Sequence, residues 1–339
     1  MKSFGSDNHS GVHPAIMAAI MAANQQHVIA YGDDSFTQQL TKIIKEVFGK
    51  QAEPYLVFNG TGANVVSLRA CVQPFHSILC ADTAHIAVDE CGSPEFMTHA
   101  ALRTIPTPDG KLTPELLLPH LENLGFEHHS QPKVVYISQC TELGTLYTPG
   151  EIKLLADFLH GYGMYLHLDG ARIANAAVAL NKSFKELTVD CGVDIMSFGA
   201  TKNGLMMGEM VIAFRPELAE NLKYIRKQSA QLYSKMRFAA CQFLPYLQQG
   251  IWKENAEHAN EMAQMLRNRI FEAGYDKFTQ PTQANIILLQ LPQPVIEKLL
   301  AQTFFYIWNE HRHEIRLVTS WDTTQEDVEH FMECLVSAS

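Results

Sequence analysis

The sequence predicts an α/β protein with a large domain, in which helices sandwich a mostly parallel sheet, and a smaller C-terminal α/β domain. Two observations lead to this prediction. Short apolar runs alternate with amphipathic stretches through the middle of the chain, which is typical of buried strands joined by crossover helices. After about Ile251 the pattern changes to a long polar-rich helix and shorter elements. We therefore expect a large domain over residues 1–250, whose N-terminal segment contributes to the functional site, and a small domain over residues 251–339.

Six apolar runs are the candidate strands of the large domain. They are Tyr55–Phe58, Ile78–Ala81, Lys133–Ser138, Met164–Leu168, Ile195–Phe198 and Met210–Phe214. The stretch Glu151–Gly161 is predicted to be a helix, because its apolar residues share one face and Pro149 stands just ahead of it. The elements expected after residue 250 are a helix over Lys253–Ala273, the apolar run Asn285–Leu291, a helix near Val295–Ala301, two short strands and a final helix from about Thr324.

The composition is that of a globular protein. With 339 residues, 47% of them hydrophobic and 18% charged, the chain can bury a large core. No run approaches the ~20 consecutive apolar residues that cross a bilayer. The start MKSFGSDNHSGVHP lacks the apolar centre of a secretory signal. We expect a soluble and unprocessed protein.

The cysteines and charges exclude several classes of function. The seven cysteines are scattered without a C-x-x-C pair, which argues against a disulfide framework or a zinc cage and favours a cytoplasmic location. The net charge of −10, without a basic run, argues against nucleic acid or an anionic membrane as a partner. The fifteen histidines show no H-E-x-x-H spacing, so no metal site is expected.

Two segments that each follow a candidate strand give the most information about the functional site. They are HLDGARIANA, which contains Asp169, and SFGATKNG, which contains Lys202. Ligands of a parallel sheet bind beyond the carboxyl ends of its strands, so this carboxylate and this amine are expected to share one crevice. Taken singly, Asp169 fits a helix cap or a loop ion pair, and Lys202 fits a solvated loop lysine.

A third segment, FNGTGAN over Phe58–Asn64, favours a functional role for Asp169 and Lys202 over these structural ones. A strand enters a Gly-rich turn and then a helix, where exposed N–H groups and Thr61 can hold a phosphate. The turn matches neither G-x-G-x-x-G nor G-x-x-x-x-G-K-[ST], which disfavours a nucleotide. A phosphate cradle, a strand-end carboxylate and a loop lysine are together what pyridoxal 5′-phosphate requires.

These segments belong to a longer series of motifs. In order they are SDNHSG at Ser6–Gly11, YGDDSFT at Tyr31–Thr37, NGTGAN, DTAHIAVDE at Asp82–Glu90, TELGTLYTP, HLDGARIANA, FGATKNG and IRLVTSWDTT at Ile315–Thr324. Over most of its length the sequence resembles the low-specificity L-threonine aldolases, in the β-eliminating lyase group of pyridoxal-phosphate enzymes. The resemblance implies the type I fold of aspartate aminotransferase. It also implies cleavage of L-threonine, L-allo-threonine and related β-hydroxy-α-amino acids to glycine and an aldehyde.

The resemblance assigns roles around the cofactor. It makes Lys202 the lysine that binds pyridoxal phosphate as a Schiff base, and Asp169 the partner of the pyridine nitrogen. Gly60, Thr61 and Gly62 match the phosphate-binding turn. His85 matches the histidine that stacks on the ring, although an isolated histidine would more often be structural. Glu90 either orients His85 or is a solvated loop acid.

Further residues are implied for the substrate and for a partner subunit. Ser6, Arg172 and Arg316 match positions that hold the substrate carboxylate, for which the planar fork of arginine is suited. Arg316 could equally make an ion pair between domains. Arg237 resembles an arginine donated to the cofactor phosphate across a subunit interface, where Tyr31 is also expected. Both imply a homodimer or a dimer of dimers.

The sequence departs from the family pattern at SQCTELG, over residues 138–144, where other members carry an Asn-Thr-His segment. If that histidine helps to deprotonate the substrate hydroxyl, then Glu142, Gln139, His85 or a bound water must do so here. Three alternative functions stay open: another lyase or aminotransferase reaction on the same fold, a pyridoxal-phosphate binder without turnover, and a class I aldolase on a (β/α)8 barrel. The preferred amino acid, any cation site and the choice between dimer and tetramer also stay open.

Overall fold

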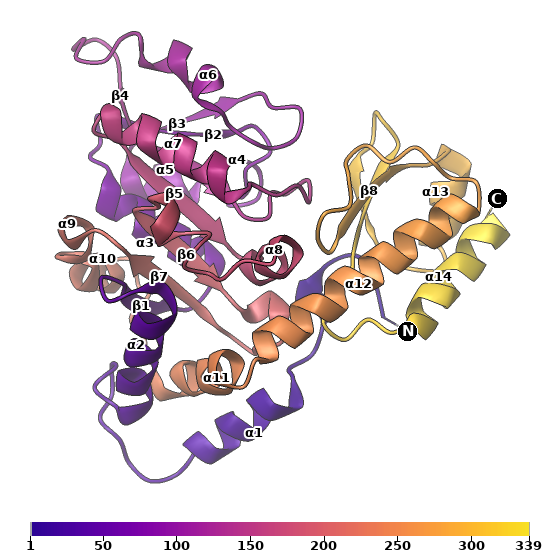
Figure 1. The fold of residues 1–339 in the computed structure, drawn as a ribbon, viewed down its shortest axis with the longest axis horizontal. Coiled ribbons are helices and arrows are strands. Elements are labelled where there is room, and N and C mark those ends of the chain that lie inside the picture. The colour runs from indigo at the N-terminus through magenta and orange to yellow at the C-terminus, as the bar shows by residue number, and fades with distance from the viewer. Residues whose placement is uncertain (1, 339) are drawn as a thin grey trace.

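A seven-stranded sheet forms the centre of the protein. The structure, a computed structural model, describes residues 2–338. Within these residues the larger sheet has the strand order β1-β7-β6-β5-β4-β2-β3 (Figure 1). Its strands are β1 Glu53–Val57, β2 His76–Ala81, β3 Ala101–Ile105, β4 Gln131–Ser138, β5 Tyr165–Gly170, β6 Ile195–Gly199 and β7 Glu209–Ala213. All six candidate strands are present, with ends shifted by a few residues.

The prediction of a mostly parallel sheet is confirmed. Strands β3, β2, β4, β5 and β6 pair in parallel, whereas β7 runs antiparallel to both β6 and β1. Antiparallel neighbours need only a short connection, and residues 200–208 join β6 directly to β7. This connection carries Lys202 at the carboxyl end of β6. The sequence analysis missed β3, a strand at the sheet edge whose Ala101 and Thr104 are exposed.

Helices cover both faces of this sheet. On β4, Val134 and Tyr136 pack into the cluster under α3 Gly60–Cys71, whereas Val135 and Ile137 pack into the opposite cluster. The helices of that opposite side are α2 Ser35–Phe48, α7 Pro149–Gly161, α8 Ile173–Leu180 and α11 Arg237–Gln248. The other helices of this part are α1 Pro14–Ala23, α4 His85–Val88, α5 Ser93–Thr98, α6 Pro114–Leu117, α9 Pro216–Ala219 and α10 Leu222–Gln228, with 3-10 turns at Asp7–His9, Leu118–Leu121, Val189–Cys191 and Thr201–Asn203.

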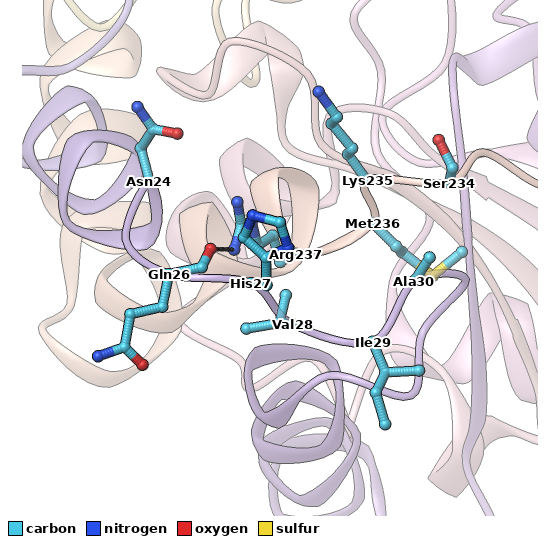
Figure 2. A pocket seen from close by; sticks show the side chains of 10 residues that line it. All are labelled: Asn24, Gln26, His27, Val28, Ile29, Ala30, Ser234, Lys235, Met236 and Arg237. Atoms are coloured by element: carbon cyan, nitrogen blue, oxygen red, sulfur yellow. Dashed lines mark hydrogen bonds between the residues drawn. The ribbon is translucent and has the colours of Figure 1, made fainter.

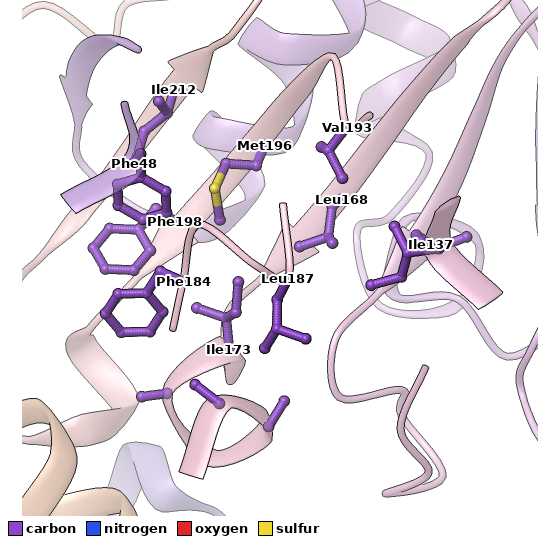
Figure 3. Packing of buried hydrophobic residues seen from close by; sticks show 14 of the residues in the cluster. Phe48, Ile137, Leu168, Ile173, Phe184, Leu187, Val193, Met196, Phe198 and Ile212 are labelled. Carbon is purple, nitrogen blue, oxygen red and sulfur yellow. The ribbon is translucent and has the colours of Figure 1, made fainter. Parts of the chain in front are cut away.

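An aromatic cluster holds α2 against β6. The rings of Phe48, Phe184 and Phe198 lie with centroids 5.3 to 5.6 Å apart, next to Met196 and Ile173 (Figure 3). Each of these rings is almost fully buried. Such close packing fixes the carboxyl end of β6, and therefore the loop that carries Lys202, against the rest of the sheet.

A second, smaller sheet follows α12 Ile251–Glu272. Its strands are β8 Ile286–Gln290, β9 Tyr306–Asn309 and β10 Glu314–Val318, and it packs with α13 Gln293–Leu300 and α14 Gln325–Ala338. The long helix α12 runs from the large sheet to the small one (Figure 1). Its Ile251 packs in the large core, whereas its Leu266 and Ile270 pack in the small one. Since α12 belongs to both cores, the domain boundary expected at residues 250 and 251 stays a prediction.

The N-terminal segment crosses from the small sheet to the large one. Phe4 lies in the small core, and its backbone bonds to Phe304 and Val318. The next residues continue toward the carboxyl ends of the large sheet. No helix among residues 2–338 has the length and apolar character of a membrane span. Each of the seven cysteines lies in this described part and is a free thiol.

Candidate active site

One cavity lies at the carboxyl ends of the strands in the large sheet. It is built from the start of α3 and of α4, the carboxyl ends of β4, β5 and β6 with the loops after them, and the first residue of β7. Its lining residues are Gly60, Asn64, His85, Ser138, Cys140, Glu142, Asp169, Ala171, Arg172, Ser197, Lys202 and Glu209. The structure therefore brings together the Gly-rich turn, Asp169 and Lys202, which come from three distant parts of the sequence.

Asp169 is an ionised carboxylate held by three hydrogen bonds. Its Oδ2 accepts from Tyr136 Oη at 2.5 Å and from Asn64 Nδ2 at 3.0 Å, and its Oδ1 accepts from the Ala171 N–H at 2.9 Å. Burial by itself would raise the pKa of Asp169, but these hydrogen bonds and the Lys202 ammonium hold it below its ordinary value. The cavity thus contains a permanent negative charge at the end of β5.

Asn64 connects Asp169 to the other polar groups of the cavity. Its Nδ2 also donates to Glu90 Oε1 at 2.8 Å, and its Oδ1 accepts from Ser197 Oγ at 2.7 Å. Asn64 is almost fully buried on α3, and Ser197 lies beside Asp169 on the neighbouring strand. A buried amide with this many partners fixes the orientation of each of them.

His85 is oriented by a buried carboxylate. Its Nδ1 lies 2.8 Å from Glu90 Oε1, and its backbone N–H donates to Glu142 Oε1 at 2.8 Å. The hydrogen bond to Glu90 raises the pKa of His85, although burial opposes this. The sequence left open whether Glu90 orients His85 or is a solvated loop acid. The structure favours the first role, because the Glu90 side chain is fully buried and bonded to His85. The ring of His85 lines this cavity and a neighbouring one.

Lys202 lies in the short connection from β6 to β7. Its Nζ forms no hydrogen bond or ion pair with any residue among 2–338. Burial and the Arg172 guanidinium lower the pKa of Lys202, against the attraction of Asp7, Asp169 and Glu209. An amine with a lowered pKa is more often neutral, and a neutral amine is the form that attacks a carbonyl carbon.

The two arginines expected to hold a carboxylate differ in their surroundings. Arg172 is already paired: its Nε donates to Asp7 Oδ2 at 2.7 Å and its Nη2 to Asp7 Oδ1 at 2.8 Å. Arg316 has no ion pair within the described chain, and its buried Nε lacks a hydrogen-bond partner. Its guanidinium lies over the ring of Trp308 instead of an acid. Within the described chain, Arg316 is therefore the less engaged of the two cations.

Arg316 opens into the neighbouring cavity, which it lines together with Ser6 and His85. The hydroxyl of Ser6 accepts a hydrogen bond from the Asn8 N–H at 3.2 Å, at the start of the 3-10 turn that contains Asp7. His85 lines both this cavity and the cavity of Lys202. A small ligand beside His85 is therefore close to residues of both cavities.

The Gly-rich turn begins α3. Asn59 caps this helix by accepting from the Gly62 N–H at 2.7 Å. A side chain at residue 62 would collide with Gln231, whereas no atom lies within 4 Å of the Cβ position at Gly60. The open space at the N-terminus of α3 therefore lies at Gly60, while the Gly62 N–H is engaged by the cap.

Arg237 and Tyr31 lie outside this cavity. Arg237 Nη1 donates to the carbonyl oxygens of Gln25 and Gln26 and lines a separate cavity between residues 24–30 and 234–237 (Figure 2). Tyr31 is 53% exposed, and its N–H donates to the Ser234 carbonyl. Within one chain, neither residue lines the cavity of Lys202.

The sequence analysis did not single out several residues of the cavity. Asp7, Asn64, Tyr136 and Glu209 all belong to it or bond to groups that do. Glu209 had a visible signal, since a charged residue opens the apolar run GEMVIAF. Burial raises the pKa of Glu209 to about 7, although Thr201 and Lys202 oppose this.

Comparisons with known proteins agree with this geometry. The model of the family described as β-eliminating lyases matches residues 3–292. The low specificity L-threonine aldolase of Pseudomonas aeruginosa is 39% identical over 328 residues, covering 96% of this chain and 95% of that protein. The protein of the same name from Pseudomonas sp. is 37% identical, with the same coverage of both chains.

Solved structures show the same relationship. The threonine aldolase of Leishmania major superposes with a TM-score of 0.92 at 28% identity, over 99% of both chains. Aspartate aminotransferase from Thermus thermophilus superposes over 99% of this chain and 90% of that chain, with a TM-score of 0.73 at 14% identity, and so shares the fold. The resemblance and the fold type expected from the sequence are confirmed. This chain belongs to the β-eliminating lyase family, among relatives named low specificity L-threonine aldolase.

Proposed function

We propose that this protein cleaves L-threonine, L-allo-threonine and related β-hydroxy-α-amino acids to glycine and an aldehyde, with pyridoxal 5′-phosphate as its cofactor. The observation that carries the proposal is a single cavity lined by Lys202, Asp169 and His85, in a chain 39% identical to a low specificity L-threonine aldolase. A nucleophilic amine and an ionised carboxylate in one cavity suit a cofactor that needs both.

The residues of the cavity fit this cofactor. The Lys202 amine has no partner among residues 2–338 and is available for a Schiff base with the cofactor aldehyde. The carboxylate of Asp169 stays ionised, as a partner of a protonated ring nitrogen must. The N-terminus of α3 has open space at Gly60, where a phosphate would meet backbone N–H groups and Thr61.

Bound pyridoxal phosphate supplies an electron sink for the pair released when a bond to the substrate Cα breaks. The ionised carboxylate of Asp169 would support this chemistry by favouring the protonated form of the ring nitrogen. Arg316, whose Nε has no partner, binds the substrate carboxylate together with Ser6 and the remaining Nη1 of Arg172. A carboxylate held in this way fixes which bond to Cα is aligned for cleavage.

We also propose that the protein is a homodimer or a dimer of dimers, with Arg237 and Tyr31 contributed to the site of the neighbouring subunit. Apolar side chains are exposed on α1 and the loop after it, including Met21 at 69% and Ile29 at 70%. Val28 and Ile29 of this loop line the cavity of Arg237 (Figure 2). Exposed apolar patches of this kind mark surfaces that pack against another protein.

The test of the reaction uses the lysine. The purified protein should be yellow, and Lys202→Ala should lose both the visible absorbance and the release of acetaldehyde from L-threonine. Lys50→Ala, which removes an exposed lysine, is the matched control and should keep both. Aldehyde, ammonia and keto acid are measured from a panel of β-hydroxy amino acids. Full turnover by Lys202→Ala, or ammonia as the main product, would contradict the proposal.

A further inference from the structure

Glu142 is a carboxyl group in the cavity to which the proposed function gives no task. It lies on the loop between β4 and α7. The loop is rigid: the Thr141 N–H donates to the Thr145 carbonyl, the Gly144 N–H donates to the Thr141 carbonyl, and the hydroxyls of both threonines lie 2.7 Å apart. Gly144 has a φ of +78° and abuts Ile286 of the small sheet. This turn holds Glu142 in one position.

The two oxygens of Glu142 have different surroundings. Oε1 accepts from Ser138 Oγ at 2.7 Å and from the His85 N–H at 2.8 Å. Oε2 accepts no hydrogen bond from residues 2–338, and Glu142 lines the same cavity as Lys202 and Asp169. One oxygen is therefore an anchor, and the other is available to a ligand.

Gln139 and His85 are the two other side chains that were considered for the same task. Gln139 donates to the Tyr147 carbonyl at 2.7 Å and accepts from the Tyr147 N–H at 3.0 Å, so both ends of its amide are used. His85 has its Nδ1 bonded to Glu90, so only its Nε2 could accept a proton, and the raised pKa of the ring favours the protonated form, which cannot accept one. Burial also raises the pKa of Glu142, which makes its carboxylate a stronger base than an exposed one.

We propose that Glu142 is the general base that removes the proton from the β-hydroxyl of the substrate, an inference that rests on the proposed cleavage reaction. The O–H bond breaks and its proton bonds to Glu142 Oε2. The oxygen forms the carbonyl of the departing aldehyde, while the Cα–Cβ electron pair stays with Cα and is accepted by the bound cofactor. Glu142 returns its proton to water, and Cα takes one from solvent.

The test compares two reactions at the same site. Cleavage of L-threonine needs a base for the β-hydroxyl, whereas exchange of the glycine α-hydrogen with deuterium from solvent does not, because glycine has no β-carbon. In Glu142→Gln the amide oxygen still accepts from Ser138 and His85, so the loop keeps its anchor. We expect cleavage to fall by about 100-fold or more, as for loss of a general base, with glycine exchange within a few-fold of the parent enzyme.

Two further variants separate chemistry from structure. Glu142→Asp keeps a carboxylate and should cleave at least about ten times faster than Glu142→Gln. Glu122→Gln, which changes an exposed glutamate outside the cavity, is the matched control and should leave cleavage unchanged. The proposal is overturned if Glu142→Gln cleaves at the parental rate, if cleavage and glycine exchange fall together, or if Glu142→Asp is no faster than the amide. A parent enzyme that releases no aldehyde from any β-hydroxy amino acid would instead refute the proposed function.

Discussion

Asp7 binds Arg172 through two parallel hydrogen bonds, of 2.7 and 2.8 Å, across 165 positions of sequence. Asp7 also accepts from Asn285 Nδ2 at 3.1 Å, next to β8 of the small sheet. Burial would raise the pKa of Asp7, but Arg172 holds it below its ordinary value, so the pair is charged. This pair joins the N-terminal segment, the large sheet and the small sheet at the edge of the active site.

Removal of the Asp7 charge should lower the stability of the folded protein. In Asp7→Asn the buried Arg172 loses the one anionic partner that it has among residues 2–338, and breaking a buried pair in this way typically lowers the free energy of unfolding by about 3–5 kcal/mol. Asp157→Asn is the matched control, because it breaks an exposed pair with Lys153 on α7 and should cost less than about 0.5 kcal/mol. Urea unfolding of both variants measures the difference. Equal stabilities would show that the Asp7 pair does not hold these parts together.

Asn64 should matter for both stability and cofactor binding. Asn64→Leu removes a donor from Asp169 and Glu90 and an acceptor from Ser197. Each buried group left unsatisfied costs about 1–3 kcal/mol. The pKa of Asp169 should rise, since the Asn64 hydrogen bond helps to lower it.

Absorbance titration of the Asn64→Leu protein with pyridoxal phosphate measures the functional part of this effect, and the affinity should fall at least about tenfold. Asn123→Leu, in an exposed loop, is the control and should bind the cofactor normally. A normal affinity in Asn64→Leu would mean that Asp169 is held without this amide.

The strands of the large sheet were predictable because burial on both faces leaves a simple trace, a short and continuous apolar run. Strand β3 lacks this trace, since Arg103 and Thr104 interrupt its apolar residues at the sheet edge. Strand direction was also hidden: the apolar run of β7 does not differ from that of a parallel strand, although β7 is antiparallel to both neighbours. Periodicity reports which faces are buried, and pairing depends on the connections.

The site was predictable to a similar degree. Asp169, Lys202 and the turn at Gly60 follow strands, so the topology of the sheet brings them to one edge. The partners behind them were not visible, because hydrogen bonds such as Asn64 to Asp169 span 105 positions and need no local pattern. The pairing of Arg172 with Asp7 was hidden for the same reason. The sequence analysis considered an ion pair only for Arg316, whereas the structure pairs Arg172 and leaves the Nε of Arg316 without a partner among residues 2–338.

Glu209 should give the stability of the cofactor-free protein a distinct pH dependence. Burial raises the pKa of Glu209 from 4.5 to about 7. The unfolded chain therefore loses this proton near pH 4.5 and the folded chain near pH 7, so rising pH favours the unfolded state between these values. The effect is on the order of 3 kcal/mol and is complete above pH 7. Glu209→Gln should thus match the parent near pH 4.5 and exceed its stability at pH 8. Urea unfolding between pH 4.5 and pH 8 measures the stability of both proteins. If the two stabilities change with pH in parallel, the raised pKa assigned to Glu209 is contradicted.

An exchange of subunits between two variants can show whether Arg237 serves the active site of its own subunit or that of the neighbouring one. If Arg237 serves the site of the neighbouring subunit, Lys202→Ala and Arg237→Ala are each inactive alone, but a mixed dimer contains one intact site. That site combines Lys202 of one subunit with Arg237 of the other. Random exchange between equal amounts of the two variants should then restore about a quarter of the parental acetaldehyde release.

The control for this experiment pairs two residues that lie in the same cavity of one chain. Lys202 and Asp169 both line it, so mixing Lys202→Ala with Asp169→Ala leaves every site with one defect and should restore nothing. Recovery in the Arg237 mixture alone would assign Arg237 to the partner's site. If neither mixture recovers although hybrids form, Arg237 acts within its own subunit. Arg237 would then support activity only by fixing the loop after α1, through its hydrogen bonds to the Gln25 and Gln26 carbonyl oxygens.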